Sequence, residues 1–159
     1  MSTSAGGQAE CFVCRKHRGE IALPGGAIYE DALVYAGHAA GPPGQGTVYR
    51  GYLIAEPKRH AAGWEDLTAD EAAALGRLLA RLCRALRESE GAEHVYMAVL
   101  GDHVAHLHVH LLPRYPGTPP EYWGFRVDEW PDAPQADERA VAEVCERLRG
   151  YLRGDTALA

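Results

Sequence analysis

The segment 106–110 reads His-Leu-His-Val-His and places three histidines at every second position of the chain. Side chains of an extended strand alternate between its two faces, so the three imidazoles project from one face and Leu107 and Val109 from the other. At ~3.3 Å per residue, the Cα atoms of His106 and His110 lie ~13 Å apart, which is too far for all three rings to share one metal ion on a straight strand. We therefore expect a strand with one apolar face and one chemical face, whose histidines serve two separate centres.

A second cluster of reactive side chains lies far from this strand, where Cys11 and Cys14 form a C-x-x-C motif. This spacing is typical of half a zinc site or of a redox pair. The flanks are rich in glycine before the motif and in basic residues after it, which favours a metal site. A disulfide is not expected, because no secretory signal precedes the motif and we expect a cytoplasmic protein. A tetrahedral zinc ion would need two further ligands, which histidines can supply.

The composition predicts a soluble globular protein, since 47% of the residues are hydrophobic and 24% are charged. No apolar run approaches the ~20 residues that cross a membrane, so we expect no membrane partner. The net charge of −6 argues against general nucleic-acid binding but allows a small anionic ligand in a local pocket. We expect residues 1–9 to form a disordered tail and residues 10–159 to form a single domain.

Hydrophobic periodicity predicts an α+β fold with an antiparallel sheet. Strands are expected over residues 28–36, 49–55, 95–100 and 105–112. Thr68 and Glu71 form a capping box that begins a long helix, and Gly91 ends it. This helix carries leucines at helical spacing: Leu75, Leu78, Leu79, Leu82 and Leu86. A last helix is expected over about residues 137–153.

Taken together, these motifs resemble the histidine triad (HIT) family, and the two cysteines resemble its zinc-binding bacterial subgroup. The segments 28–31 and 53–60 are similar to the family's first core strand and to its strand ending in Pro-Lys-Arg-His. The resemblance covers about residues 10–115. It implies a HIT-like fold, with an antiparallel sheet of about five strands, a long central helix and a C-terminal helix.

The zinc-binding members of the family imply a structural zinc ion held by Cys11, Cys14, His60 and His106. Two thiolates and two neutral imidazoles would give a closed tetrahedral site with no open position for a substrate. In that arrangement His106 ties the N-terminal cysteines to the strand that carries His108.

The resemblance makes His108 the candidate nucleophile, because the middle histidine of the family attacks the α-phosphorus of a nucleotide. Imidazole suits this role because it is nucleophilic while neutral, provided that an acceptor holds the proton of its other nitrogen. His110 is expected to donate to a phosphate oxygen, and backbone N–H groups of the turn 101–103 to bind the same phosphate. Arg114 is a further candidate cation, although an arginine at the end of a strand is commonly only solvated.

The family binds the base with apolar residues of its first strand, which here implies Ile28 and Leu53. The family's ribose-binding acid has no clear counterpart, and His38 is the candidate substitute. A glutamine and a hydroxyl residue that precede the triad in many members are replaced by Asp102 and His103. We expect Asp102 to turn away from the phosphate or to pair with His103, whose protonated ring would act as general acid toward the leaving group. The alternative for both residues is a turn that faces solvent.

The expected activity is hydrolysis or nucleotidyl transfer on nucleoside 5′-phosphate conjugates, such as dinucleoside polyphosphates or nucleoside phosphoramidates, through a nucleotidyl-histidine intermediate. Three alternatives stay open: a phosphorylase or transferase that uses phosphate or a sugar phosphate, a non-catalytic nucleotide-binding adaptor, and a metalloenzyme with an open zinc site on the triad. The resemblance also implies a homodimer, with the helix from Thr68 and the strand 95–100 at its interface.

Overall fold

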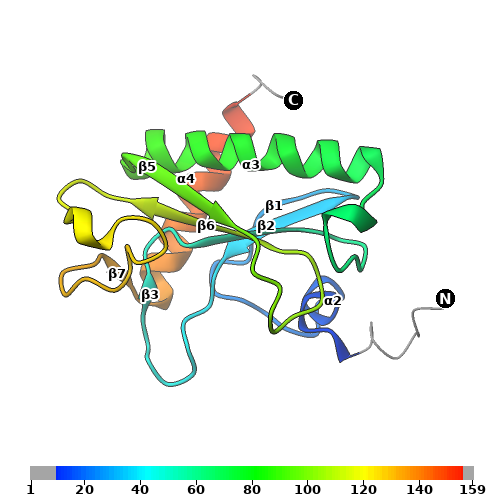
Figure 1. Ribbon diagram of the computed structural model, residues 1–159, viewed down its shortest axis with the longest axis horizontal. Helices are drawn as coiled ribbons and strands as arrows, with labels where there is room; N and C mark the ends of the chain where they lie inside the picture. The colour runs from blue at the N-terminus through cyan, green and yellow to red at the C-terminus, as the bar shows by residue number, and fades with distance from the viewer. Residues whose placement is uncertain (1–9, 156–159) are drawn as a thin grey trace.

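The computed structural model describes residues 10–155, and the tail expected over residues 1–9 lies outside them. Its centre is an antiparallel sheet of five strands in the order β1-β2-β4-β6-β5 (Figure 1). The strands are β1 (Ala27–Glu30), β2 (Val34–His38), β4 (Leu53–Pro57), β5 (His94–Ala98) and β6 (Val109–Arg114). A separate pair consists of β3 (Val48–Tyr49) and β7 (Gln135–Ala136). The expected α+β fold with a five-stranded antiparallel sheet is confirmed.

The two faces of the sheet carry different elements. The long helix α3 (Ala69–Glu90) and the C-terminal helix α4 (Glu138–Gly154) pack on one face. The opposite face carries the short helix α2 (Phe12–His17) toward one end and the β3–β7 pair toward the other (Figure 1). Two 3₁₀ turns are Trp64–Asp66 and Pro120–Tyr122. Within the described residues, no helix has the length and apolar character needed to cross a membrane.

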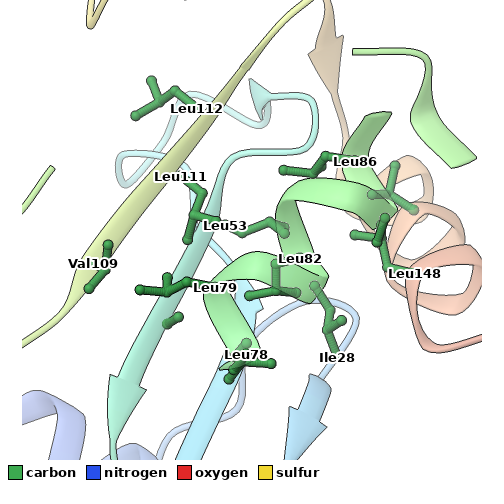
Figure 2. Close-up of a cluster of buried hydrophobic side chains, with 14 of the residues drawn as sticks. Ile28, Leu53, Leu78, Leu79, Leu82, Leu86, Val109, Leu111, Leu112 and Leu148 are labelled. Carbon is green, nitrogen blue, oxygen red and sulfur yellow. The ribbon is translucent and has the colours of Figure 1, made fainter. Parts of the chain in front are cut away.

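Apolar side chains of the sheet and the two long helices form the core between them (Figure 2). The predicted leucine stripe of α3 is buried, and Leu75, Leu82 and Leu86 are fully covered. Leu53 of β4 and Leu111 of β6 face this stripe from the sheet. Burial of each such leucine contributes ~1.5–3 kcal/mol relative to an exposed one, so this layer holds β4 and β6 in place, and the triad histidines lie within or just before β6.

The ends of α3 follow the local sequence as predicted. The Thr68 hydroxyl accepts a hydrogen bond from the Glu71 N–H at 3.3 Å, and the Glu71 carboxylate accepts one from the Thr68 N–H at 2.9 Å. At the other end, Gly91 adopts the left-handed conformation with φ of 77°. Such a residue costs little backbone energy only when it is glycine, so the helix ends there.

The strand expected over 28–36 is wrong, because the chain reverses within it. β1 and β2 are the two arms of a hairpin that turns at residues 31–33. The Asp31 carboxylate accepts hydrogen bonds from the N–H groups of Leu33 at 2.7 Å and of Val34 at 2.9 Å. An aspartate that binds backbone groups two and three residues ahead stabilises a turn instead of an extended strand.

The strand expected over 105–112 begins only at Val109, so the first two triad histidines precede it. β4 pairs with β6 from Leu53 to Ala55 and ends at Pro57, which leaves no ladder partner for residues 106–108. Their backbone is held by other contacts, among them the Leu107 N–H donating to the Ala61 carbonyl at 2.6 Å. The alternation persists nevertheless, since Leu107 and Val109 are in the core.

Candidate functional site

Two cysteines and two histidines from three segments meet beside the sheet. Cys11 and Cys14 lie at the start of α2, His60 follows β4, and His106 precedes β6. Their candidate ligand atoms all lie within 4.8 Å of one another. The Cys14 Sγ is 3.4 Å from His60 Nδ1 and 3.5 Å from His106 Nδ1. The structure therefore brings together the four residues expected to bind a metal.

The chemistry of this cluster fits a structural zinc ion. The His106 Nε2–H donates to the Pro57 carbonyl at 2.8 Å, so Nδ1 presents its lone pair to the cysteine sulfurs. Burial raises the pKa of Cys14 to about 11, and the neighbouring Cys11 adds to the effect. A cation that binds both sulfurs would offset this cost by stabilising the thiolates. Two sulfur and two imidazole ligands are a closed zinc donor set, which leaves no open position for a catalytic metal.

The other two triad histidines are not part of this centre and lie side by side. Their ring centroids are 4.8 Å apart. The His108 Nδ1–H donates to the His106 carbonyl at 2.7 Å, which leaves the Nε2 lone pair free. The Tyr52 hydroxyl lies 2.6 Å from His110 Nδ1. Burial lowers the pKa of His110, and the adjacent His108 lowers it further, which favours the neutral ring.

A cavity of about 290 Å³, here called the catalytic cavity, opens between α2 and the sheet, and His108 and His110 line it. Much of its wall is apolar: Phe12, Val13, Leu23, Ile54 and Val104. The cavity thus combines two imidazole rings with a largely apolar wall, which is the usual make-up of a small-molecule site.

A buried ion pair in this wall could not be found by the sequence reasoning. Glu56 is 0% exposed and lines the cavity together with Lys16, its ion-pair partner from α2. His17 Nε2 lies 2.9 Å from the same carboxylate. Burial alone would raise the pKa of Glu56, but the His17 hydrogen bond and the Lys16 charge outweigh it and lower that pKa. The only sequence signal is an acid inside an apolar strand; its partners lie 39 and 40 positions away and share no local pattern with it.

Two residues expected at the base lie elsewhere. Ile28 and Leu53 are buried in the core beneath α3 (Figure 2). Side chains alternate along β4, so Leu53 faces the helices, whereas its neighbour Ile54 faces the catalytic cavity. Leu53 therefore does not line this cavity, and the adjacent Ile54 does.

His38 is also used for structure. It is 1% exposed, and its Nδ1–H donates to the Ala39 carbonyl at 2.8 Å. Its Nε2 accepts a hydrogen bond from the Gly51 N–H at 3.0 Å. Burial lowers the pKa of His38, in keeping with a neutral ring. Both ring nitrogens are occupied, so His38 has no free group for a ribose although it borders the catalytic cavity.

The remaining candidates lie outside this cavity. Asp102 and His103 are exposed, and within residues 10–155 neither has a hydrogen bond or an ion pair, so they are not paired with each other. The Arg114 guanidinium lies 4.0 Å from the Trp123 ring centroid and donates to the Tyr96 hydroxyl at 3.1 Å. Arg114 thus packs at the far end of β6, four residues beyond His110.

The sequence model of the HIT domain family matches residues 22–117, which is more than half of the chain. The chain therefore belongs to the histidine triad family, whose members bind small nucleotides and are generally hydrolases or transferases. No curated protein matches the sequence.

Several solved structures share the fold. A zinc-bound histidine triad family protein from Mycobacterium smegmatis is 23% identical, with a TM-score of 0.67 over 92% of this chain and 96% of that one. A hypothetical histidine triad nucleotide-binding protein from Sulfolobus tokodaii is 17% identical, with a TM-score of 0.69 over 91% and 93%. A Hit-like protein involved in cell-cycle regulation from Bartonella henselae is 19% identical, with a TM-score of 0.65 over 89% and 96%.

Proposed function

We propose that this protein is a nucleotide hydrolase or nucleotidyltransferase that acts on nucleoside 5′-phosphate conjugates, with His108 as its nucleophile. The observation that carries the proposal is the 2.7 Å hydrogen bond from His108 Nδ1 to the His106 carbonyl. It fixes the tautomer whose Nε2 is nucleophilic, on a side chain that lines the catalytic cavity. Membership in the histidine triad family supports the nucleotide as substrate class.

The reaction takes two steps. In the first, His108 Nε2 attacks the α-phosphorus, the bond to the leaving group breaks, and a nucleotidyl-histidine forms. His110 assists by donating from Nε2 to a phosphate oxygen, because Tyr52 occupies its Nδ1 at 2.6 Å. In the second step, water or another acceptor attacks the phosphorus and releases the nucleotidyl group from His108.

His103 remains our candidate for protonating the leaving group. It is exposed on the segment that leads directly into His106, and within the described residues no contact holds its ring elsewhere. A protonated imidazole is a stronger acid than the hydroxyl that it replaces.

We further infer that zinc occupies the centre formed by Cys11, Cys14, His60 and His106. The donor set supports this, and the Mycobacterium smegmatis relative is described as zinc-bound. When bound, the ion supplies a fixed attachment between α2 and the sheet. A closed donor set argues against the alternative of an open catalytic zinc.

A labelling experiment tests the nucleophile. The protein is mixed with a nucleoside phosphoramidate, quenched without acid, and analysed by mass spectrometry with and without inorganic phosphate. We expect one nucleotidyl group on the peptide that contains residues 106–110, and its loss, together with more than a thousandfold fall in kcat, in His108→Ala. His94→Ala, at an exposed position of β5, is the matched control. Full turnover in His108→Ala would refute the assignment, and a nucleoside diphosphate product in phosphate would identify a phosphorylase.

A homodimer and a cytoplasmic location belong to the same proposal. β5 is an edge strand of the sheet, and Met97 on it is 49% exposed. Val99 and Leu100, just beyond it, are 40% and 64% exposed. An open edge with exposed apolar side chains is a surface that a second copy can cover. Light scattering at micromolar concentration should give twice the mass of one chain, and a monomer would contradict the proposal.

A further inference from the structure

A second cavity lies beyond the catalytic histidines on the same side of the sheet. It has a volume of about 410 Å³ and is bounded by the loop 40–47, by Tyr52 and by the segment that precedes β7. We call it the Tyr52 cavity. Six polar side chains line it: Gln45, Thr47, Tyr49, Tyr52, Asp128 and Gln135. Its polar wall differs from the largely apolar wall of the catalytic cavity.

The Tyr52 cavity adjoins the reaction centre. The Tyr52 hydroxyl lies 2.6 Å from His110 Nδ1, so one side chain both lines this cavity and holds a catalytic residue. Ala40 lines both cavities. The register of β4 and β6 is consistent with this contact. Ile54 pairs with His110, and Tyr52, two residues before Ile54, lies on the same face. A group attached to a phosphate at His110 can therefore extend into this space.

The residues that line the Tyr52 cavity carry negative charge and no positive charge. None of its lining residues is a lysine, an arginine or a histidine, whereas Asp128 is an acid without an ion-pair partner in the described part of the chain. Burial raises the pKa of Tyr52, and the Asp128 charge raises it further. The carboxylate thus lies close enough to act on the hydroxyl that contacts His110. A second phosphate would meet this negative charge with no cation to offset it.

We propose that the Tyr52 cavity is the subsite for the leaving group, and that it takes a neutral or cationic group rich in hydrogen-bond donors, such as an amine. The proposal rests on nucleotidyl transfer by His108 as proposed above. In that step, the phosphorus–nitrogen bond of a phosphoramidate breaks as the bond to His108 Nε2 forms. The departing amine takes up a proton from His103, the donor proposed above, and water then attacks the phosphorus and releases the nucleoside monophosphate from His108. Asp128 acts as a specificity residue that favours amine conjugates over polyphosphates.

The test uses three phosphoramidates of one nucleoside, made from 1,3-diaminopropane, 3-aminopropanol and β-alanine. These leaving groups are of similar size and carry a cation, a hydroxyl and an anion. We expect the full-length protein to show a kcat/KM at least about fivefold higher for the cationic than for the anionic conjugate at low salt, with the ratio falling as salt screens the exposed carboxylate. Asp128→Asn should bring the ratio toward one, and Asp128→Lys should invert it.

Asp132→Asn provides the control, because Asp132 is an exposed acid of the same segment that does not line the cavity. Its ratio should equal that of the unaltered protein. Turnover of all three conjugates with the same ratio in Asp128→Lys would overturn the subsite and leave the proposed function standing. Absence of turnover and of a His108 label with every conjugate would overturn both.

Discussion

The two walls of the catalytic face are held in different ways. On one side, α2 is attached through the metal ligands Cys11 and Cys14 and through the buried pair of Lys16 with Glu56. On the other side, aromatic packing and hydrogen bonds hold the segment that follows β6. One example is the Arg114 guanidinium, which stacks on the Trp123 ring.

Both walls contain residues outside the range 22–117 that the family model matches, namely α2 before it and Asp128 after it. Between them, β6 carries His110, and His108 lies immediately before this strand. In the proposed function, the range that the family model matches carries the reacting histidines, whereas the flanking segments shape the space for the two halves of the substrate. A six-residue helix buries too little apolar surface to hold itself, which explains why its wall needs a metal and an ion pair.

The largest expected effect comes from removal of the metal ligands. Cys11→Ser together with Cys14→Ser should abolish stoichiometric zinc in elemental analysis and lower the melting temperature by at least 10 °C, because binding of a structural zinc ion contributes directly to folding. KM should rise more than kcat falls, since α2 forms one wall of the catalytic cavity. The control is Cys83→Ser, which alters a thiol of α3 outside the centre. Retention of one zinc per chain by the double variant would contradict the site.

An intermediate effect is expected from Glu56→Ala. The substitution leaves the Lys16 ammonium buried without its partner, and such a loss typically costs ~3–5 kcal/mol of folding free energy. Zinc should remain bound, since neither residue is a ligand. Urea denaturation with elemental analysis measures both quantities. Glu30→Ala is the matched control, because its pair with Lys58 is partly exposed and should contribute under ~1 kcal/mol. Equal losses in the two variants would show that the buried pair does not anchor α2.

The smallest effect on folding is expected at Tyr52, where the two cavities meet. Tyr52→Phe removes the hydroxyl that lies 2.6 Å from His110 and should cost only ~1 kcal/mol of stability. The variant should lower kcat about tenfold with little change in KM, because an unheld His110 ring samples orientations that do not donate to phosphate. Tyr96→Phe, on β5 at the edge of the sheet, is the control. A change in KM alone would place Tyr52 in binding instead of positioning.

The sequence predicted those features that depend on local chemistry. The alternation of histidines from 106 to 110, the capping box at Thr68 and the C-x-x-C spacing each reflect geometry within a few residues, and all three are present in the structure. The hairpin at Asp31 interrupts the strand expected over 28–36, because the Asp31 carboxylate binds the Leu33 N–H and stabilises a turn.

Other features required the tertiary fold. Whether Leu53 or Ile54 faces the substrate depends on which side of β4 the helices cover, and periodicity alone gives only the alternation. The pairing of Glu56 with Lys16 joins positions 40 residues apart. The role proposed for Asp128 depends on its position with Tyr52 in the lining of one cavity, which only the tertiary fold determines. Long-range electrostatics of this kind leave no local pattern in a single sequence.

His106 takes part in both centres, but through different atoms. Its side chain points to the cysteines, whereas its main-chain carbonyl fixes the tautomer of His108. Every amino acid has a main-chain carbonyl, so the hydrogen bond that this group accepts from His108 does not depend on which residue occupies position 106. A substitution of His106 would therefore remove a metal ligand and leave in place the main-chain carbonyl that accepts the hydrogen bond from His108.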